Sequence, residues 1–199
     1  MQVIESSRKE EGLRERKRRE TLQRISEVGL RLFLAHGYHA TTLDEIAAEA
    51  GISRRTFFYY FKSKDDIILG YIDDFVEALK TEIVDGATSH SPLDRVQNAM
   101  VTVFGRFETS RLLAIARLRR ESSIKRQHSL ELEQGILEAL CEVWPAKSRR
   151  ARLRLVALAS IGAMRVAVDV WLEQNGKRPL PTYFRQAFHD LRAEIAAED

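Results

Sequence analysis

Apolar residues along the chain recur at intervals of three and four, which is the spacing of one face of an α-helix. The first such stripe comprises Leu22, Ile25, Val28, Leu32 and Phe33. No segment alternates strictly between apolar and polar residues, and no hairpin turn pair stands between two β-branched runs. The pattern therefore predicts an all-α protein.

Capping residues, glycines and prolines mark the ends of the predicted helices. Thr42 and Glu45 have the spacing of a capping box, Ser53 is an expected N-cap, and Gly37 ends the first helix. The chain before the first helix, residues 1–13, is expected to be a disordered arm with both basic and acidic residues. The expected helices cover residues 14–36, 42–50, 54–61, 64–83, 92–109, 110–124, 129–143, 147–174 and 181–196.

Residues 42–61 form the most informative stretch, with the sequence TLDEIAAEAGISRRTFFYYF. A short helix, a turn with glycine and a second short helix fit a helix-turn-helix unit. Two arginines and three aromatic residues on one exposed helix suit insertion into the major groove of DNA. The alternative is a packed aromatic core with solvated arginines. The residues expected to face outward are Arg54, Arg55, Phe58, Tyr59 and Tyr60.

The charge of the chain is distributed unevenly. Residues 1–64 contain 13 Lys and Arg against 9 Asp and Glu, whereas residues 65–199 contain 19 against 20. The N-terminal part therefore carries the positive excess, which favours an anionic partner there, although a solvated basic face has the same composition. Within it, the run Arg16, Lys17, Arg18 and Arg19 either follows DNA phosphates and the minor groove or is a frayed helix start.

The stretch from Arg24 to Ile68 resembles the N-terminal domain of the TetR family of transcriptional regulators. The matching motifs are I-x-x-x-G-L-R-L-F-x-x-x-G-Y at 25–38, T-T-L-D-E-I-A-A-E-A-G-I-S at 41–53 and T-F-F-Y-Y-F-K-S-K-D-D-I-I at 56–68. The resemblance implies a helix-turn-helix DNA-binding domain at 14–63 and a helical ligand-binding and dimerisation domain at 64–199. The R-T-F-F-x-Y-F motif is similar to a branch with an acyl-CoA-like ligand-binding domain, which includes the mycofactocin regulator.

The resemblance also implies DNA contacts at matching positions. Thr42 and Lys64 match residues that contact phosphate, Tyr60 matches a residue that touches the DNA backbone, and Ser53 matches the cap of the recognition helix.

Two positions depart from the family pattern. Phe58 stands where the family usually has tyrosine, so the hydroxyl for a phosphate contact is absent. Arg55 stands where glycine is frequent, which adds a donor within reach of base edges. We expect Arg54, Arg55 and Tyr59 to read bases, with Lys17 and Arg18 among the arm contacts.

A single recognition helix reads few bases, whereas two helices related by a two-fold axis read a palindromic operator. The segment 147–174 is apolar nearly all round, and the last helix has an apolar stripe along one side. We expect a homodimer through these last two helices, with burial of both faces inside one chain as the alternative.

The resemblance further implies a pocket for a small hydrophobic or amphiphilic effector, with acyl-CoA among the candidates. Arg165 and Asp169 form either a buried ion pair or a polar anchor for an acidic head group. A cluster of basic residues has two interpretations, a solvated face or a site that meets the phosphates of a CoA-like effector. It comprises Arg117, Arg119, Arg120, Lys125 and Arg126. The expected lining residues are Phe104, Phe107, Ile115, Leu140, Trp144, Met164, Arg165 and Val168.

Other functional classes lack their motifs in this sequence. The single cysteine, Cys141, excludes an intrachain disulfide and a cysteine-based zinc site, and Gly37 separates His36 from His39. We therefore expect no enzyme activity, no cofactor and no metal. No run of about 18 apolar residues occurs, so we expect a cytoplasmic protein without a membrane span.

Together these features predict a homodimeric, ligand-responsive repressor that binds double-stranded DNA. One alternative is a DNA-binding architectural protein without a ligand. Another is a module whose N-terminal part binds protein.

Overall fold

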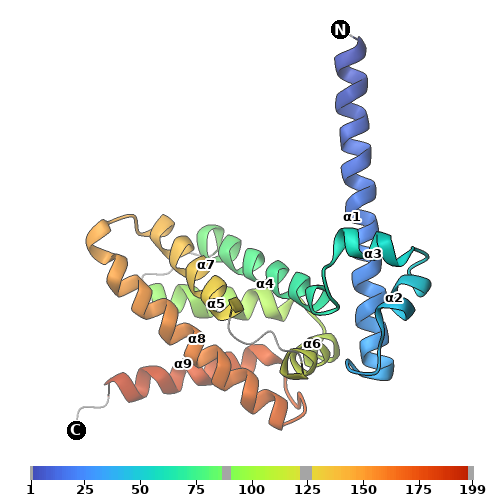
Figure 1. Ribbon diagram of the computed structural model, residues 1–199. Helices are drawn as coiled ribbons and strands as arrows, with labels where there is room; N and C mark the ends of the chain where they lie inside the picture. The colour runs from blue at the N-terminus through green and yellow to red at the C-terminus, as the bar shows by residue number, and fades with distance from the viewer. Residues whose placement is uncertain (1, 87–90, 122–126, 197–199) are drawn as a thin grey trace. The chain divides into compact units, whose positions relative to one another are not determined.

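The computed structural model describes residues 2–86, 91–121 and 127–196, and this part of the chain consists of helices joined by short connections (Figure 1). No β-strand occurs within these ranges, which confirms the predicted all-α fold. The helices are α1 (Gln2–His36), α2 (Leu43–Glu49), α3 (Arg54–Tyr60), α4 (Asp65–Asp85), α5 (Pro92–Gly105), α6 (Thr109–Glu121), α7 (Gln127–Val143), the 3₁₀ turn η1 (Lys147–Arg149), α8 (Arg150–Glu173) and α9 (Leu180–Ala196).

The chain divides into two compact units, Met1–Gly70 and Tyr71–Asp199. The boundary lies several residues beyond the expected one at 63/64, because the first turn of α4 packs in the N-terminal unit. At Gly29 of α1, an added Cβ would lie 2.7 Å from Cδ1 of Ile67, so α1 and α4 approach closely there. The apolar core of this unit includes Ile25, Phe33, Ile46, Phe57 and Ile67.

Helix α1 begins at Gln2, where we expected a disordered arm over residues 1–13. The segment contains no proline, and the run Arg8, Lys9, Glu10 and Glu11 consists of residues that favour a helix. Ion pairs one turn apart support the helix further along, because Arg16 Nε lies 3.2 Å from Glu20 Oε1.

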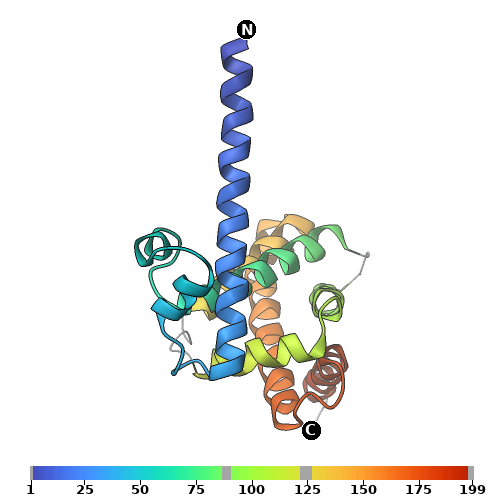
Figure 2. The same ribbon diagram turned by 90° about the vertical axis from the view of Figure 1, so that its right-hand side faces the viewer.

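The C-terminal unit is a bundle in which α8 packs against α7 and α9, and α5 packs against α9 (Figures 1 and 2). Trp171 of α8 is fully buried in its core, and its indole Nε1 donates a hydrogen bond to the carbonyl of Arg178 at 3.0 Å. This bond ties the connection after α8 back onto the helix.

By length and composition alone, Lys147–Glu173 is apolar enough to cross a membrane, with 44% of its most apolar window buried. We expected no membrane span, because no run of about 18 apolar residues occurs in the sequence. The packing of α8 between α7 and α9 is typical of the core helix of a bundle.

Helix α4 is continuous across the boundary between the two units, which falls between Gly70 and Tyr71. Its C-terminal end is held by the buried Arg95 of α5. The Arg95 Nε donates to the carbonyl of Ile83 at 2.6 Å, and Nη2 donates to the carbonyl of Val84 at 2.7 Å. These bonds satisfy carbonyls of the last turn that have no partner within the helix.

Candidate functional site: nucleic-acid interface and ligand cavity

The predicted capping box fixes the start of α2. Thr42 Oγ1 accepts a hydrogen bond from the backbone N–H of Glu45 at 3.2 Å, and the Thr42 N–H donates to Glu45 Oε2 at 2.7 Å. The backbone and side-chain hydrogen bonds from Thr42 lower the pKa of the Glu45 carboxyl. The Thr42 side chain is exposed beside this start.

A glycine turn and a serine cap position α3. Gly51 has a φ of +67°, a left-handed conformation that favours glycine. Ser53 Oγ accepts a hydrogen bond from the N–H of Thr56 at 3.1 Å and so caps α3 as predicted. The fully buried Phe57 packs its ring 5.6 Å from that of Phe61, which anchors the inner face of α3 in the core.

The outer face of α3 presents basic and aromatic side chains. Tyr59 is 75% exposed and Phe58 46%, the two arginines are exposed, and Tyr60 is half-buried. Arg54 Nη1 lies 3.0 Å from Asp44 Oδ2 of α2, and its guanidinium lies 5.8 Å from the centre of the Phe58 ring. Arg55 extends this surface next to it, so the five predicted residues lie together. Their contact with DNA stays a prediction.

Lys64 is fastened to the loop that joins α1 to α2. Its Nζ donates to the carbonyls of Tyr38 at 2.7 Å and Thr41 at 3.1 Å, and it lies 4.4 Å from the centre of the Tyr38 ring. The Tyr38 hydroxyl donates to Asp65, and burial together with this carboxylate raises the pKa of the phenol. Because an ammonium group has three donors, one remains for a phosphate.

The arm residues lie on the exposed part of α1. Lys17 and Arg18 are both exposed, and Arg18 Nη1 is 3.7 Å from Glu15 Oε2. The structure thus places them on a regular helix.

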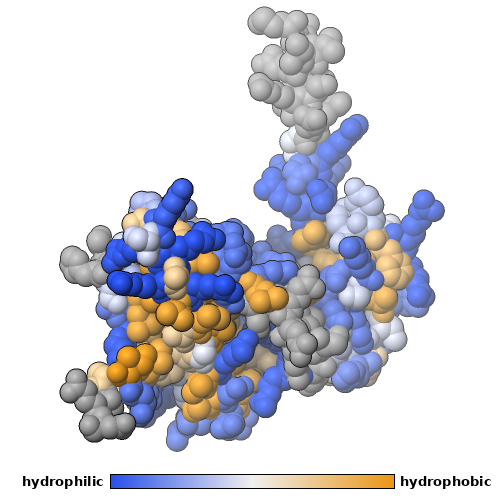
Figure 3. All heavy atoms as spheres, turned by 60° about the vertical axis from the view of Figure 1, so that its left-hand side comes forward, coloured by the Kyte–Doolittle hydropathy of each residue, from blue (hydrophilic) through white to orange (hydrophobic). Residues whose placement is uncertain are grey.

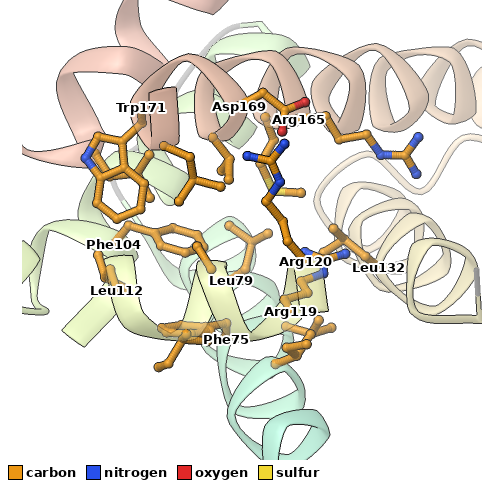
Figure 4. Close-up of a pocket in the computed structure, with 18 residues that line it drawn as sticks. Phe75, Leu79, Phe104, Leu112, Arg119, Arg120, Leu132, Arg165, Asp169 and Trp171 are labelled. Carbon is orange, nitrogen blue, oxygen red and sulfur yellow. The ribbon is translucent and has the colours of Figure 1, made fainter. Parts of the chain in front are cut away.

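The C-terminal unit contains a cavity of about 380 Å³. Six helices contribute to its wall, and most of the lining is apolar (Figure 4). The wall residues are Ile72, Phe75, Val76, Leu79, Phe104, Leu112, Ile115, Ala116, Arg119, Arg120, Leu132, Met164, Arg165, Val168, Asp169, Trp171, Leu172 and Leu180.

Five of the eight predicted lining residues lie in this wall: Phe104, Ile115, Met164, Arg165 and Val168. The other three lie elsewhere in the unit. Phe107 is 37% exposed, Leu140 is fully buried in the core, and Trp144 packs half-buried at the edge of that core.

Sequence reasoning missed the contribution of α4 to the cavity. Ile72, Phe75, Val76 and Leu79 recur at helical spacing, so the signal was present as an apolar stripe. Arg119 and Arg120 of the predicted arginine cluster also line the wall, whereas Lys125 and Arg126 lie outside the described residues. Arg165 and Asp169 are both exposed, so they are not the buried ion pair that was one of the alternatives.

Within the residues that the structure describes, no group of His, Cys, Asp and Glu side chains could hold a metal ion. Cys141 is a half-buried free thiol at the edge of the core.

The geometry defines a helix-turn-helix protein whose second helical unit encloses a cavity. Residues 25–71 match the family described as bacterial regulatory proteins, tetR family. This match confirms the resemblance of that segment to the N-terminal domain of the TetR family.

Two relatives and one solved structure illustrate this similarity. The chain is 36% identical over 101 residues to the HTH-type transcriptional regulator TcmR of Streptomyces glaucescens, covering 51% of this chain and 45% of the relative. It is 36% identical over 95 residues to a proposed mycofactocin biosynthesis transcriptional regulator, MftR, of Mycobacterium tuberculosis, covering 48% of each. The matched part thus spans about half the length of these relatives.

The solved structure is that of FadR from Thermus thermophilus, a TetR-family transcriptional repressor in complex with lauroyl-CoA. It superposes with a TM-score of 0.59 at 19% identity over 89% of this chain and 96% of that one. At this identity the likeness establishes the fold alone.

Proposed function

We propose that the protein is a transcriptional repressor that binds a palindromic DNA operator as a homodimer and is released by a small hydrophobic or amphiphilic effector. The observation that carries the proposal is the outer face of α3. There, Arg55 and Tyr59 are exposed on a helix whose opposite side is fixed in the core by Phe57. Arginine donates two hydrogen bonds to guanine in the major groove, and a rigid helix holds it in register.

The phosphate contacts are assigned to residues around this helix. Thr42, Ser53 and the third donor of Lys64 lie at or next to helix starts, where backbone N–H groups also favour anions. Lys17 and Arg18 on α1 add positive charge. These contacts carry little sequence information, so they position the protein while the α3 residues select the operator.

The dimer is assigned to α8 and α9. Figure 3 shows apolar side chains gathered on the surface of the C-terminal unit. On α8 the exposed residues Leu155, Leu158, Val166 and Val170 follow helical spacing, and Ile195 of α9 is 71% exposed. An apolar stripe of this kind is unfavourable in water and is typical of an interface. A two-fold axis through it gives the two recognition helices that a palindrome requires.

The effector is assigned to the cavity of the C-terminal unit. Its volume and apolar wall suit a small hydrophobic or amphiphilic molecule. Acyl-CoA is a candidate because FadR of Thermus thermophilus, which has this fold, was solved with lauroyl-CoA. Helix α4 contributes to the wall and continues into the N-terminal unit, so a ligand that prefers one position of α4 shifts DNA affinity.

The test is selection of genomic fragments on the purified protein, with its molar mass in solution measured alongside. We expect enrichment of one palindrome bound by a dimer, with half-sites separated by about 34 Å or a small multiple of it. Six to ten phosphate contacts predict a slope of about −5 to −9 for log affinity against log salt.

Two outcomes contradict this proposal. Salt-sensitive binding without sequence enrichment favours a DNA-binding architectural protein that needs no ligand. Absence of DNA binding means that the aromatic helix serves another partner, such as a protein.

The substitution Leu158→Asp tests the dimer separately, because a charge in the apolar stripe is expected to halve the molar mass. The control Arg152→Asp, at an exposed position near the start of α8, is expected to leave the molar mass unchanged.

A further inference from the structure

The two arginines at the start of α3 differ in how their side chains are held. Arg54 Nη1 donates hydrogen bonds to Asp44 of α2, at 3.2 Å from Oδ1 and 3.0 Å from Oδ2. Its guanidinium also lies 5.8 Å from the centre of the Phe58 ring, one turn further along α3. Among the described residues, the Arg55 side chain forms no ion pair, hydrogen bond or ring contact. Arg54 is therefore held at two points, whereas Arg55 is not.

Both supports of Arg54 are themselves positioned by neighbouring structure. Asp44 lies in the first turn of α2, whose start is fixed by the capping box. Phe58 packs edge-on against the buried Phe57, with ring centres 5.9 Å apart and ring planes at 90°. The carboxylate and the ring thus have defined places beside Arg54, and all of these residues belong to the N-terminal unit.

The ion pair between Arg54 and Asp44 contributes little to folding stability. The Arg54 side chain is 60% exposed and that of Asp44 66%, and water screens ion pairs that are so exposed. The pair instead restricts a long side chain, which otherwise loses much rotamer freedom when it binds a partner. A duplex that covers α3 excludes water from the pair and strengthens it.

The part of the guanidinium that the supports leave open suits guanine. Asp44 is bonded through Nη1, so Nε and Nη2 of Arg54 have no acceptor among the described residues. These two nitrogens form one edge of the planar group. An edge with two parallel donors pairs with O6 and N7 of guanine in the major groove.

We propose that Asp44 and Phe58 are positioning residues that fix Arg54 for reading one guanine in each half-site. Asp44 adds selectivity and no attraction, because its carboxylate repels the phosphates of every duplex alike. The inference rests on the proposed operator binding, which is therefore measured first on the natural chain. A natural chain that binds no DNA overturns both, whereas operator binding in which Asp44 has no role overturns this inference alone.

The experiment uses the full chain and duplexes that carry the operator recovered by fragment selection. Each guanine of a half-site is replaced in turn by 7-deazaguanine, which lacks the N7 acceptor, and an unrelated duplex measures binding without base readout. We expect one replacement to weaken binding of the natural chain by roughly tenfold. The same replacement has no effect on Arg54→Ala, which identifies the guanine that Arg54 reads.

Substitution of Asp44 separates positioning from a structural role. Asp44→Ala is expected to reduce the tenfold discrimination to roughly twofold or threefold. The same variant binds the unrelated duplex at least as tightly as the natural chain does, because a carboxylate that repels phosphates is gone. A purely structural loss weakens binding to both duplexes together. The matched control is Glu49→Ala, which removes an equal charge from α2 where Glu49 pairs with Arg31 at 2.7 Å, and which keeps the discrimination.

Substitutions of Phe58 test the second support. Phe58→Leu removes the aromatic face and is expected to reduce the discrimination, whereas Phe58→Tyr keeps the face and the discrimination. Both supports act through Arg54, so neither Asp44→Ala nor Phe58→Leu changes the discrimination further when Arg54 is already alanine.

Several outcomes overturn the proposal: an operator in which no guanine replacement depends on Arg54, unchanged discrimination in Asp44→Ala, or an equal loss in Glu49→Ala. An effect of Asp44→Ala that persists in the Arg54→Ala background also overturns it, because Asp44 then contacts DNA itself. Denaturant titration of each variant verifies its fold. Lower stability together with equal weakening on both duplexes assigns Asp44 a structural role instead.

Discussion

The side chains expected to act lie outside the core in the N-terminal unit and around a cavity in the C-terminal unit. The first group is held on short helices whose ends are set by residues three positions apart, as with Thr42 and Glu45. The second group comes from six successive helices, and its residues range from Ile72 to Leu180. The comparison teaches that a surface site can be specified by local chemistry, whereas a cavity exists only after long-range packing.

The largest expected effect tests whether the two units depend on each other. Phe57→Ala removes a fully buried ring from the N-terminal core and is expected to cost about 3–5 kcal/mol of stability there. The two tryptophans, Trp144 and Trp171, both lie in the C-terminal unit. We expect circular dichroism to show an early partial transition, while the tryptophan fluorescence transition stays in place.

The control for this change is Phe58→Ala, which removes an exposed ring from the same helix and leaves both transitions nearly unchanged. If the fluorescence transition of Phe57→Ala shifts together with the dichroism transition, the two units unfold as one. The two units then cannot be treated as independently folded parts.

The next effect distinguishes base readout from backbone contact within the N-terminal unit. Arg55→Ala is expected to cost about 1–3 kcal/mol of binding and to relax the preference at one base position per half-site. The loss is measured by titration of the selected operator and of its single-base variants. An affinity that falls equally for every duplex contradicts the assignment of Arg55 to a base edge.

Lys64→Ala tests a phosphate contact, in contrast to the base contact of Arg55. Lys64 also has a structural role, so this variant has a second expected effect. We expect binding to all duplexes to weaken alike, with the salt slope reduced by about one. The loss of its hydrogen bonds to the carbonyls of Tyr38 and Thr41 is also expected to lower the free energy of unfolding by about 1–3 kcal/mol. Unchanged stability in a denaturant titration would show that these bonds are replaced by water.

A smaller effect concerns the turn that sets the angle between α2 and α3. Gly51→Ala places a side chain at a φ of +67° and is expected to cost roughly 1–2 kcal/mol of stability. Gly12→Ala on α1 is the control, since an added Cβ there meets nothing within 4 Å. Thermal unfolding of the two variants should therefore shift in opposite directions, and equal shifts are incompatible with a strained turn.

The smallest effect is a pH dependence from Glu45. Hydrogen bonds from Thr42 lower its pKa in the folded state, so its stabilising contribution is present at neutral pH and is lost as the pH falls through that lowered pKa. Glu45→Ala removes the contribution. The stability difference between this variant and the natural chain is expected to shrink as denaturant titrations are repeated from pH 7 down to pH 3, and a constant difference contradicts it.

Local signals explain why part of the molecule could be predicted from its sequence. The capping box at Thr42, the cap at Ser53 and the glycine turn depend only on near neighbours, so the helix-turn-helix and the all-α fold follow from them. The cavity depends on which helices meet. Leu140 and Trp144 are apolar at helical spacing, as Phe104 is, but only Phe104 lies in the cavity wall.

At the beginning of α1, in contrast, local signals did not predict where the helix starts. Its residues favour a helix by composition, yet no capping signal marks a start, and we placed the start at residue 14 instead of Gln2.

Helix α4 contains one glycine, Gly70, at which its helical conformation is weakest. Its 21 residues give a length of about 30 Å at 1.5 Å per residue, and Gly70 lies within this continuous helix at the boundary of the two units. An added Cβ at Gly70 meets nothing within 4 Å, so space does not require glycine there. Because glycine weakens a helix by about 0.5–1 kcal/mol relative to alanine, the helical conformation of α4 is intrinsically least stable at Gly70. The stability of this single helix turn thus decides whether α4 persists as one uninterrupted helix.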